Sequence, residues 1–365
     1  MNKLALNRLN LWQKLGALVL AMLVPTVLVG FFYFTAMGGE LSQAGDEIAG
    51  AHYLAALGAI ESSLLTHEGR AFTLASGDKA SRSAALAAQD DVTQAFERAA
   101  AVDAQLGLQY GVRQDFEALR SDWAALASAT LQQNAEQGAT GHDQLIERVR
   151  QLSSEVAAAS GVASDPDRTT HSLLEAAAID LPQALIDAGS LRRYAVDAAS
   201  KGYLGGDDQM GIVISHRRLD SDLESVRTAL GQLPASSRAQ LTPVLRDAVS
   251  QLHGLYADVG SQLLKASNIK VSGGAMYEAG VPTDAALRKL LTASADAARS
   301  ALRARASSLA YHRNVTALLA LLALGGALAL TRLVRLSLSR PLTRAIDAFE
   351  HISQGRYDNK LHTRR

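Results

Sequence analysis

The chain has 365 residues, its 36 Lys and Arg balance 36 Asp and Glu, and it has no cysteine. The lack of cysteine excludes a disulfide framework, a thiolate zinc site and a cysteine nucleophile. Two apolar stretches, residues 15–37 and 315–331, lie on either side of a long polar segment. Each stretch is long enough to cross the roughly 30 Å hydrocarbon core of a membrane as a helix.

The charges beside the two stretches predict the topology. Three basic residues precede the first stretch, and eight basic residues against three acidic ones follow the second. Lys and Arg near membrane ends stay in the cytoplasm, so we expect both termini inside and residues 40–313 outside a bacterial inner membrane. The segment between the stretches has a net charge of −8, which argues against a nucleic-acid partner.

The first stretch is predicted to be a retained anchor rather than a cleaved signal peptide. It is longer than the apolar core of a signal peptide, and no small-residue cleavage site follows it. It ends at Phe31-Phe32-Tyr33-Phe34, which is typical of aromatic residues at a membrane interface. Pro25 should kink this helix, which lipid-embedded helices tolerate.

The polar segment is predicted to be helical throughout. No part of it alternates apolar and polar residues as a strand does, whereas apolar residues recur at steps of three and four, as in an antiparallel bundle. One such series is Val112, Phe116, Leu119, Trp123 and Leu126. The fold class expected is therefore all-α: a membrane-anchored long helical bundle with two transmembrane helices.

Glycine and proline divide the polar segment into about eight helical pieces. The expected turns are at Gly77-Asp78, residues 106–111, Gln137-Gly138, Asp165-Pro166, Gly205-Gly206, Pro234 and Gly273-Gly274. Asp165 and Pro166 are predicted to cap and begin a helix. The predicted organisation has two stacked four-helix modules: a tail (1–14), transmembrane helix 1 (15–37), module 1 (38–164), module 2 (165–313), transmembrane helix 2 (314–334) and a partial linker (335–365).

A short amphipathic helix is expected after the second stretch. It begins at Arg340-Pro341-Leu342, has apolar residues three or four apart, and ends at Gly355. This segment resembles the first half of a HAMP linker, a parallel four-helix bundle formed by a dimer. The resemblance implies signal transmission by six of its residues: Pro341, Leu342, Ile346, Phe349, Ile352 and Gly355.

The chain as a whole resembles the sensory half of a bacterial methyl-accepting chemotaxis protein with a large helical periplasmic domain. That resemblance implies a homodimeric receptor that senses a small extracytoplasmic ligand and signals through the second transmembrane helix. Its partners would be the membrane and a small organic acid or other anion, with no nucleic acid. The alternatives are the sensor portion of a diguanylate cyclase or histidine kinase, or a periplasmic scaffold bundle.

A carboxylate ligand would need inward-facing arginines, since the guanidinium is a planar two-pronged donor. The candidates are Arg70, Arg192 and Arg193, with Tyr194 beside the last. The simpler interpretation of each is a solvated helix face or a surface ion pair. No HExxH, no histidines four apart, no GxSxG and no phosphate-binding loop occur, so we expect no metal, no cofactor and no enzymatic activity.

Overall fold

The computed structural model describes residues 11–165, 167–334, 337 and 349. Over these residues every element is a helix and no strand occurs, which confirms the all-α prediction. The chain divides into two compact units. One, called the helical unit here, is Gln43–Ala306; the other, the apolar unit, consists of Met1–Ser42 and Ser307–Arg365.

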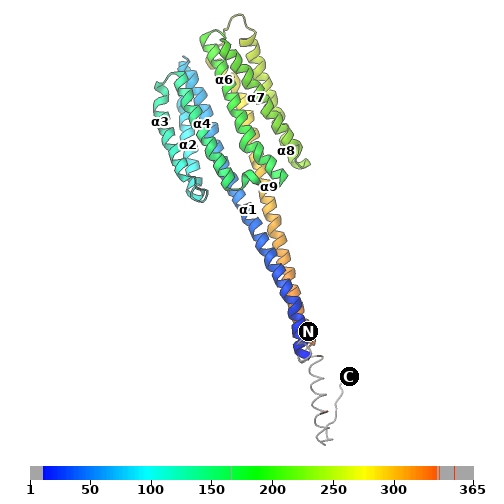
Figure 1. Cartoon of the computed structure of the whole chain (residues 1–365). Coiled ribbons are helices and arrows are strands. Elements are labelled where there is room, and N and C mark those ends of the chain that lie inside the picture. The colour runs from blue at the N-terminus through cyan, green and yellow to red at the C-terminus, as the bar shows by residue number, and fades with distance from the viewer. Residues whose placement is uncertain (1–10, 166, 335–336, 338–348, 350–365) are drawn as a thin grey trace, which may run out of the picture. The chain divides into compact units, whose positions relative to one another are not determined.

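The long helices are joined by short turns (Figure 1). They are α1 (Leu11–Ala75), α2 (Arg82–Leu106), α3 (Arg113–Ala129), α4 (Ala135–Ala159), α5 (Arg168–Glu175), α6 (Leu181–Lys201), α7 (Gly206–Gly231), α8 (Ala235–Val259) and α9 (Gly273–Val334). Short 3-10 turns lie at Lys79–Ser81, Thr130–Gln132 and Val162–Ser164, and π-helical turns lie at Ala176–Asp180 and Gly260–Leu264.

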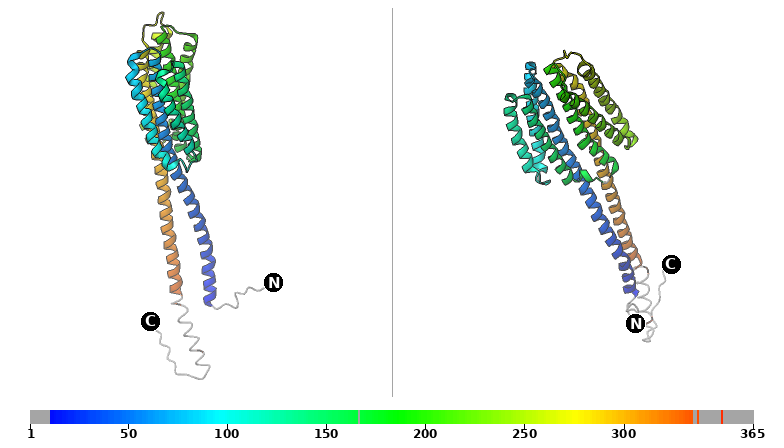
Figure 2. Two further views of the ribbon diagram at one scale, coloured as in Figure 1. Left: turned by 90° about the vertical axis from the view of Figure 1, so that its left-hand side faces the viewer. Right: turned by 45° about the horizontal axis from the view of Figure 1, so that its top comes forward.

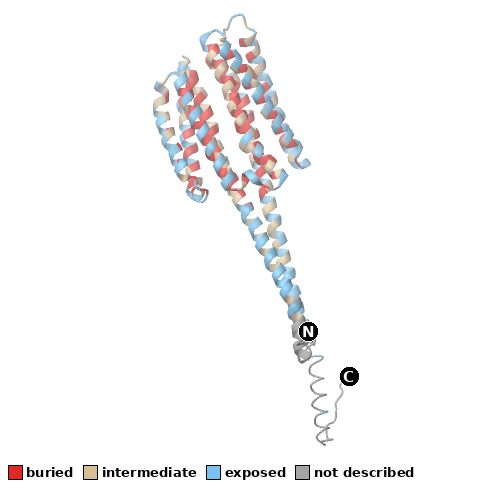
Figure 3. Ribbon diagram, viewed as in Figure 1, coloured by how far each residue is buried: buried red, intermediate tan, exposed pale blue. Residues whose placement is uncertain are grey.

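Within the helical unit, α2, α3 and α4 lie beside α1, and α6, α7 and α8 lie beside α9 (Figures 1 and 2). The two groups are side by side, and buried residues follow the inward faces of both (Figure 3). Phe96, Phe116 and Trp123 are buried, as the three- and four-residue steps predict. Tyr256 is only half-buried and stacks on His216, with ring centroids 3.6 Å apart.

Several predicted turns coincide with helix ends, and glycine explains two of them. Gly111 and Gly202 have φ of 74° and 75°, a left-handed conformation that residues with a Cβ rarely adopt. Gly202 ends α6 and Gly111 lies just before α3. The amphipathic α3 and α4 then bury their apolar stripes against each other.

Two expected boundaries are wrong. Gln137-Gly138 lies inside α4, because Asn134 caps that helix by accepting a hydrogen bond from the Gln137 N–H. Asp167, not Asp165, caps α5, and its carboxylate accepts from the N–H groups of Thr169 and Thr170. Asp165 instead pairs with Arg305 of α9 at 2.7 Å, and the same guanidinium lies 3.1 Å from Glu47 of α1.

The apolar unit contains parts of α1 and α9. Both helices are long and apolar enough to cross a membrane, and no residue of their most apolar 18-residue windows is buried. Large apolar side chains such as Phe32 and Leu321 are exposed there. A Tyr33 hydroxyl lies 3.4 Å from the hydroxyl of Thr316, which is a polar contact between the two helices.

The residues predicted to transmit a signal lie almost wholly outside the described residues. Pro341, Leu342, Ile346, Ile352 and Gly355 are among residues that the structure does not describe. Phe349 is described and its side chain is exposed.

Candidate functional site

The three arginines singled out in the sequence come together inside the helical unit. Arg70 belongs to α1, and Arg192 and Arg193 belong to α6. Arg192 is only 2% exposed and forms an ion pair with Asp284 of α9. Arg70 forms an ion pair with Glu278, also on α9. These pairs join three helices that are far apart in the chain.

Tyr277 of α9 lies between two of these cations. The guanidinium carbon of Arg70 is 4.2 Å from the centroid of the Tyr277 ring, and that of Arg192 is 4.5 Å away. The negative face of an aromatic ring attracts a cation at such distances. The ring therefore offers a favourable contact to the buried Arg192 and to the partly exposed Arg70.

Arg193 pairs with acidic residues on two other helices. Its Nη1 donates to Glu68 of α1 at 2.6 Å and to Asp143 of α4 at 3.2 Å. Burial raises the pKa of the Glu68 carboxyl, and the positive charge of Arg193 opposes that rise. All three predicted arginines are thus paired with carboxylates, which leaves the ionic cluster nearly neutral as a whole.

Two glycines allow Arg192 to lie so deep. A Cβ on Gly69 would lie 2.7 Å from Cε2 of Tyr277 and 3.0 Å from Nη2 of Arg192. A Cβ on Gly280 would lie 3.0 Å from Cδ of Arg192. Helical glycines cost stability relative to alanine, so their presence here has a packing reason.

Tyr194 lies toward α7, where it lines a separate hollow together with Arg193. Its ring packs against Gly211 of α7, where a Cβ would come within 2.6 Å of three ring carbons. The structure therefore brings together three of the four predicted ligand-binding residues. Their assignment to a ligand site stays a prediction.

A histidine pair is buried beside the cluster. Nδ1 of His67 is 2.8 Å from Nε2 of His142, and Nδ1 of His142 is 2.6 Å from the carbonyl oxygen of Gly138. A carbonyl only accepts, so Nδ1 of His142 donates to it and Nε2 of His142 accepts from His67. Burial lowers the pKa of His67 to about 3. Burial also lowers the pKa of His142, against the effect of the Gly138 bond.

The sequence did not identify the partners of the arginines: Glu68, Tyr277, Glu278 and Asp284. Gly69 and Gly280 could have indicated this site from the sequence. Each lies in the interior of a long helix, where glycine is favoured only by close packing. Among the described residues, no group of three or more His, Asp or Glu side chains could hold a metal ion.

No protein-family model matches the chain, and no curated protein matches it. One solved structure is similar: the structure of the NasR transcription antiterminator, with a TM-score of 0.59. The match has 14% sequence identity and covers 86% of this chain and 85% of that one. At this identity the similarity establishes a shared helical fold.

The comparison corrects the expected family. The similar structure belongs to a transcription antiterminator, and no family model for a chemoreceptor or a HAMP linker matches. The prediction of a methyl-accepting chemotaxis receptor is therefore wrong, and the cyclase, kinase and scaffold alternatives gain no support. The helical periodicity led to the right fold class, but many unrelated proteins share that periodicity.

The predicted partners are corrected as well. The exclusion of nucleic acid is contradicted by the similarity to a protein that regulates transcription. The anionic ligand and the homodimer have no support from the comparison. The physical reason for the first error is that net charge describes a whole segment, whereas contact with a nucleic acid needs only a local basic surface.

Proposed function

We propose that this chain is a membrane-anchored regulatory protein. The helical unit is its regulatory domain, and the apolar parts of α1 and α9 cross a bilayer. Both ends of the chain lie on the cytoplasmic side, as the basic flanks favour, so the helical unit lies outside the cytoplasm and acts on transcription indirectly. In this proposal the protein controls transcription and is not an enzyme.

The observation that carries the proposal is the fold. The similarity to the NasR transcription antiterminator extends over most of both chains, so it covers the arrangement of helices and not one shared motif. In that protein the fold serves regulation of transcription. We extend the regulatory role to this chain on that basis.

Membrane attachment is supported by the apolar unit. Its helices expose Leu, Val and Phe side chains that a water-soluble protein would bury. Two helices with about twenty consecutive apolar residues each provide enough length for a hydrocarbon core. The finer prediction of two four-helix modules, divided near Asp165, belongs to this proposal too.

The ionic cluster supplies a candidate switching element. A buried ion pair is often no more stabilising than packed apolar residues of similar size, so its value lies in selecting one arrangement over others. Here the pairs join α6 and α1 to α9 through Asp284 and Glu278. A change at one helix would alter the pairing of the others, which is the behaviour a regulatory domain needs.

Rapid depletion of the protein, followed by transcript sequencing, tests the proposal. The expected result is altered read-through at a defined set of transcripts within minutes, restored by the wild-type chain. A chain with Arg192→Met should fail to restore it, whereas the matched exposed variant Arg227→Met should succeed. Unchanged transcripts after full depletion would reject control of transcription.

A further inference from the structure

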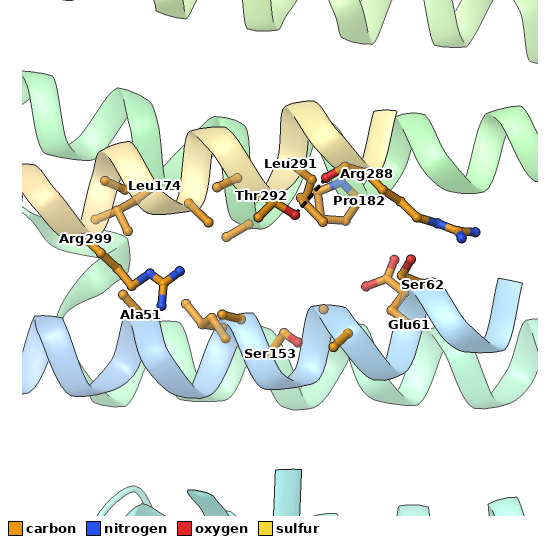
Figure 4. Close-up of a pocket in the computed structure, with 18 of the residues that line it drawn as sticks. Ala51, Glu61, Ser62, Ser153, Leu174, Pro182, Arg288, Leu291, Thr292 and Arg299 are labelled. Carbon is orange, nitrogen blue, oxygen red and sulfur yellow. Dashed lines mark hydrogen bonds between the residues drawn. The ribbon is translucent and has the colours of Figure 1, made fainter. Parts of the chain in front are cut away.

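A cavity of about 370 Å³ lies between α1 and α9, inside the helical unit (Figure 4). Its remaining wall comes from α4, from the π-helical turn Ala176–Asp180 and from Pro182 of α6. The volume lies within the range of small-molecule sites. Seven of the 19 lining residues are alanines: Ala51, Ala55, Ala59, Ala177, Ala178, Ala295 and Ala298.

The cavity exists because many of the residues that line it have small side chains. A Cβ built on Gly58, which lines it, would meet no atom within 4 Å. The π-helical turn carries one more residue per turn than an α-helix, and such turns occur frequently at functional sites. The cavity is partly open to the outside, so a small molecule can enter it.

Glu61 of α1 faces this cavity without a partner. Its residue is 4% exposed, and its Oε1 atom is buried with no hydrogen bond among the described residues. It also lines an adjoining hollow between α1, α4 and α5. A buried carboxylate oxygen with no donor is costly, and a cationic donor would relieve that cost.

The neighbouring arginines do not supply this donor among the described residues. Arg150 of α4 acts on Glu61 only through its charge, and its Nη1 lies 3.7 Å from Glu147 of its own helix. Arg288 donates from Nη2 to the Thr66 hydroxyl at 2.6 Å, and its guanidinium lies beyond Glu61 and Ser62 in Figure 4, away from the centre of the cavity. The buried Nε of Arg288 makes no hydrogen bond within the part of the chain that the structure describes, to Glu61 or to any other residue. Arg299 lies near Ala51 and pairs with Asp296 of its own helix.

We propose that this cavity binds a small organic cation, an amine or amidine on a compact apolar body, with the Glu61 carboxylate as its counter-ion. The alanine-rich walls contact the apolar body, and Ser62, Ser153 and Thr292 provide further polar groups. This inference does not rest on the proposed function, because binding would occur whatever process the chain regulates.

The charged groups around Glu61 roughly balance. Glu147 of α4 and Glu175 of α5 oppose Arg150 of α4 and Arg288 of α9, His171 lies on α5, and Arg299 lines the cavity near Ala51. The unpaired Glu61 carboxyl is therefore the group that favours a cation. Burial raises the pKa of Glu61 to about 7, Arg150 lowers it and Glu147 raises it. The carboxyl is therefore half-ionised near neutral pH, and a bound cation would stabilise its ionised form.

Three probes of the same shape test the proposal on the full chain in detergent. Benzamidine is cationic, benzamide is neutral and benzoate is anionic, and calorimetric titration gives each Kd. We expect benzamidine alone to bind, with a Kd that rises about tenfold from pH 8 to pH 6 as Glu61 takes up a proton. Equal binding of all three, preference for benzoate, or no binding of benzamidine at millimolar concentration would overturn the proposal.

Two variants connect binding to this cavity. Glu61→Gln should weaken benzamidine binding at least about thirtyfold, because the counter-ion is lost. Gly58→Leu should abolish binding by filling the space while the chain stays folded. Glu155→Gln, at an exposed site on α4, is the matched control and should leave the Kd unchanged. Full binding by Glu61→Gln would overturn the assignment of the counter-ion.

Discussion

Arg192 on α6 and Asp284 on α9 form an ion pair in the interior of the helical unit, with Arg192 2% exposed. Burial lowers the pKa of the Arg192 guanidinium, while Tyr277 and Glu68 favour its charged form. The charge is kept in the interior by its carboxylate partner and by the aromatic face beside it.

Breaking this pair from one side should be strongly destabilising. Asp284→Asn leaves a buried guanidinium without its counter-ion, which costs about 3–5 kcal/mol of unfolding free energy. Replacing both residues, as Arg192→Met with Asp284→Leu, should recover most of that loss. Chemical denaturation of the full chain in detergent measures both effects.

The exposed pair Arg227–Glu224 is the control for that experiment. Its side chains are 71% and 58% exposed, so Arg227→Met should cost less than about 1 kcal/mol. A cost for Asp284→Asn as small as that of the control would show that the buried pair contributes nothing.

Gly69→Ala should destabilise the helical unit although alanine is the better helix former. The added methyl would lie 2.7 Å from Tyr277, and overpacking of this kind costs about 1–3 kcal/mol. Gly58→Ala, where the new Cβ meets nothing within 4 Å, should instead stabilise by about 0.5–1 kcal/mol. Thermal denaturation of the two variants should give shifts of opposite sign, and shifts of the same sign would refute the packing argument.

The buried histidine pair should make stability fall in acid. His67 has a pKa of about 3 in the fold, below the usual value of about 6.5 that an unfolded chain has. Between these values the unfolded state binds more protons, so the stability present above pH 6.5 is lost progressively down to about pH 3. From pH 7 to pH 5, His67 should account for a loss of about 2 kcal/mol.

Comparing unfolding free energies at pH 7 and pH 5 tests this statement. His67→Gln should show a smaller difference between the two values than the wild-type chain does. The exposed His52→Gln variant should show the wild-type difference. An identical pH dependence in all three chains would mean that the pKa of His67 is the same in the folded and unfolded states, which would contradict the prediction.

Asp222 of α7 should act in the opposite direction. Burial, together with the charge of Asp187 on α6 and a hydrogen bond to it, raises the pKa of Asp222 to about 7. A carboxyl with a raised pKa holds its proton in the fold, so stability falls as pH rises from about 4 to about 7. Asp222→Asn should therefore raise Tm more at pH 8 than at pH 5, and Asp247→Asn, at an exposed site, should not.

The helical class could be predicted from the sequence because burial follows spacing along a helix. The stripe of Phe116, Leu119 and Trp123 is buried as expected. The helix boundaries were less predictable where several capping residues compete. Asp165 and Asp167 are both suitable caps, and Asp165 is instead paired with Arg305, which lies 140 residues away in the chain.

The candidate site was only partly predictable for the same reason. The sequence left a solvated helix face as the simpler interpretation of the arginines, because Asp284 and Tyr277 meet them only through packing of distant helices. His67 and His142 are 75 residues apart, so no local spacing indicates their contact. Nothing in the sequence near Glu61 indicated a binding site. The cavity that Glu61 faces exists only because distant helices place small residues opposite it.

The proposed function requires that the chain crosses a membrane, and site-directed labelling tests this directly. The natural chain has no cysteine, so single cysteines give an unambiguous signal. Asn7→Cys precedes the first apolar stretch, and Ser267→Cys is exposed between α8 and α9. In intact cells, a membrane-impermeant maleimide should label Cys at position 267 and label position 7 only after lysis. Protection of both positions in intact cells, with the chain recovered in the soluble fraction, would contradict the account.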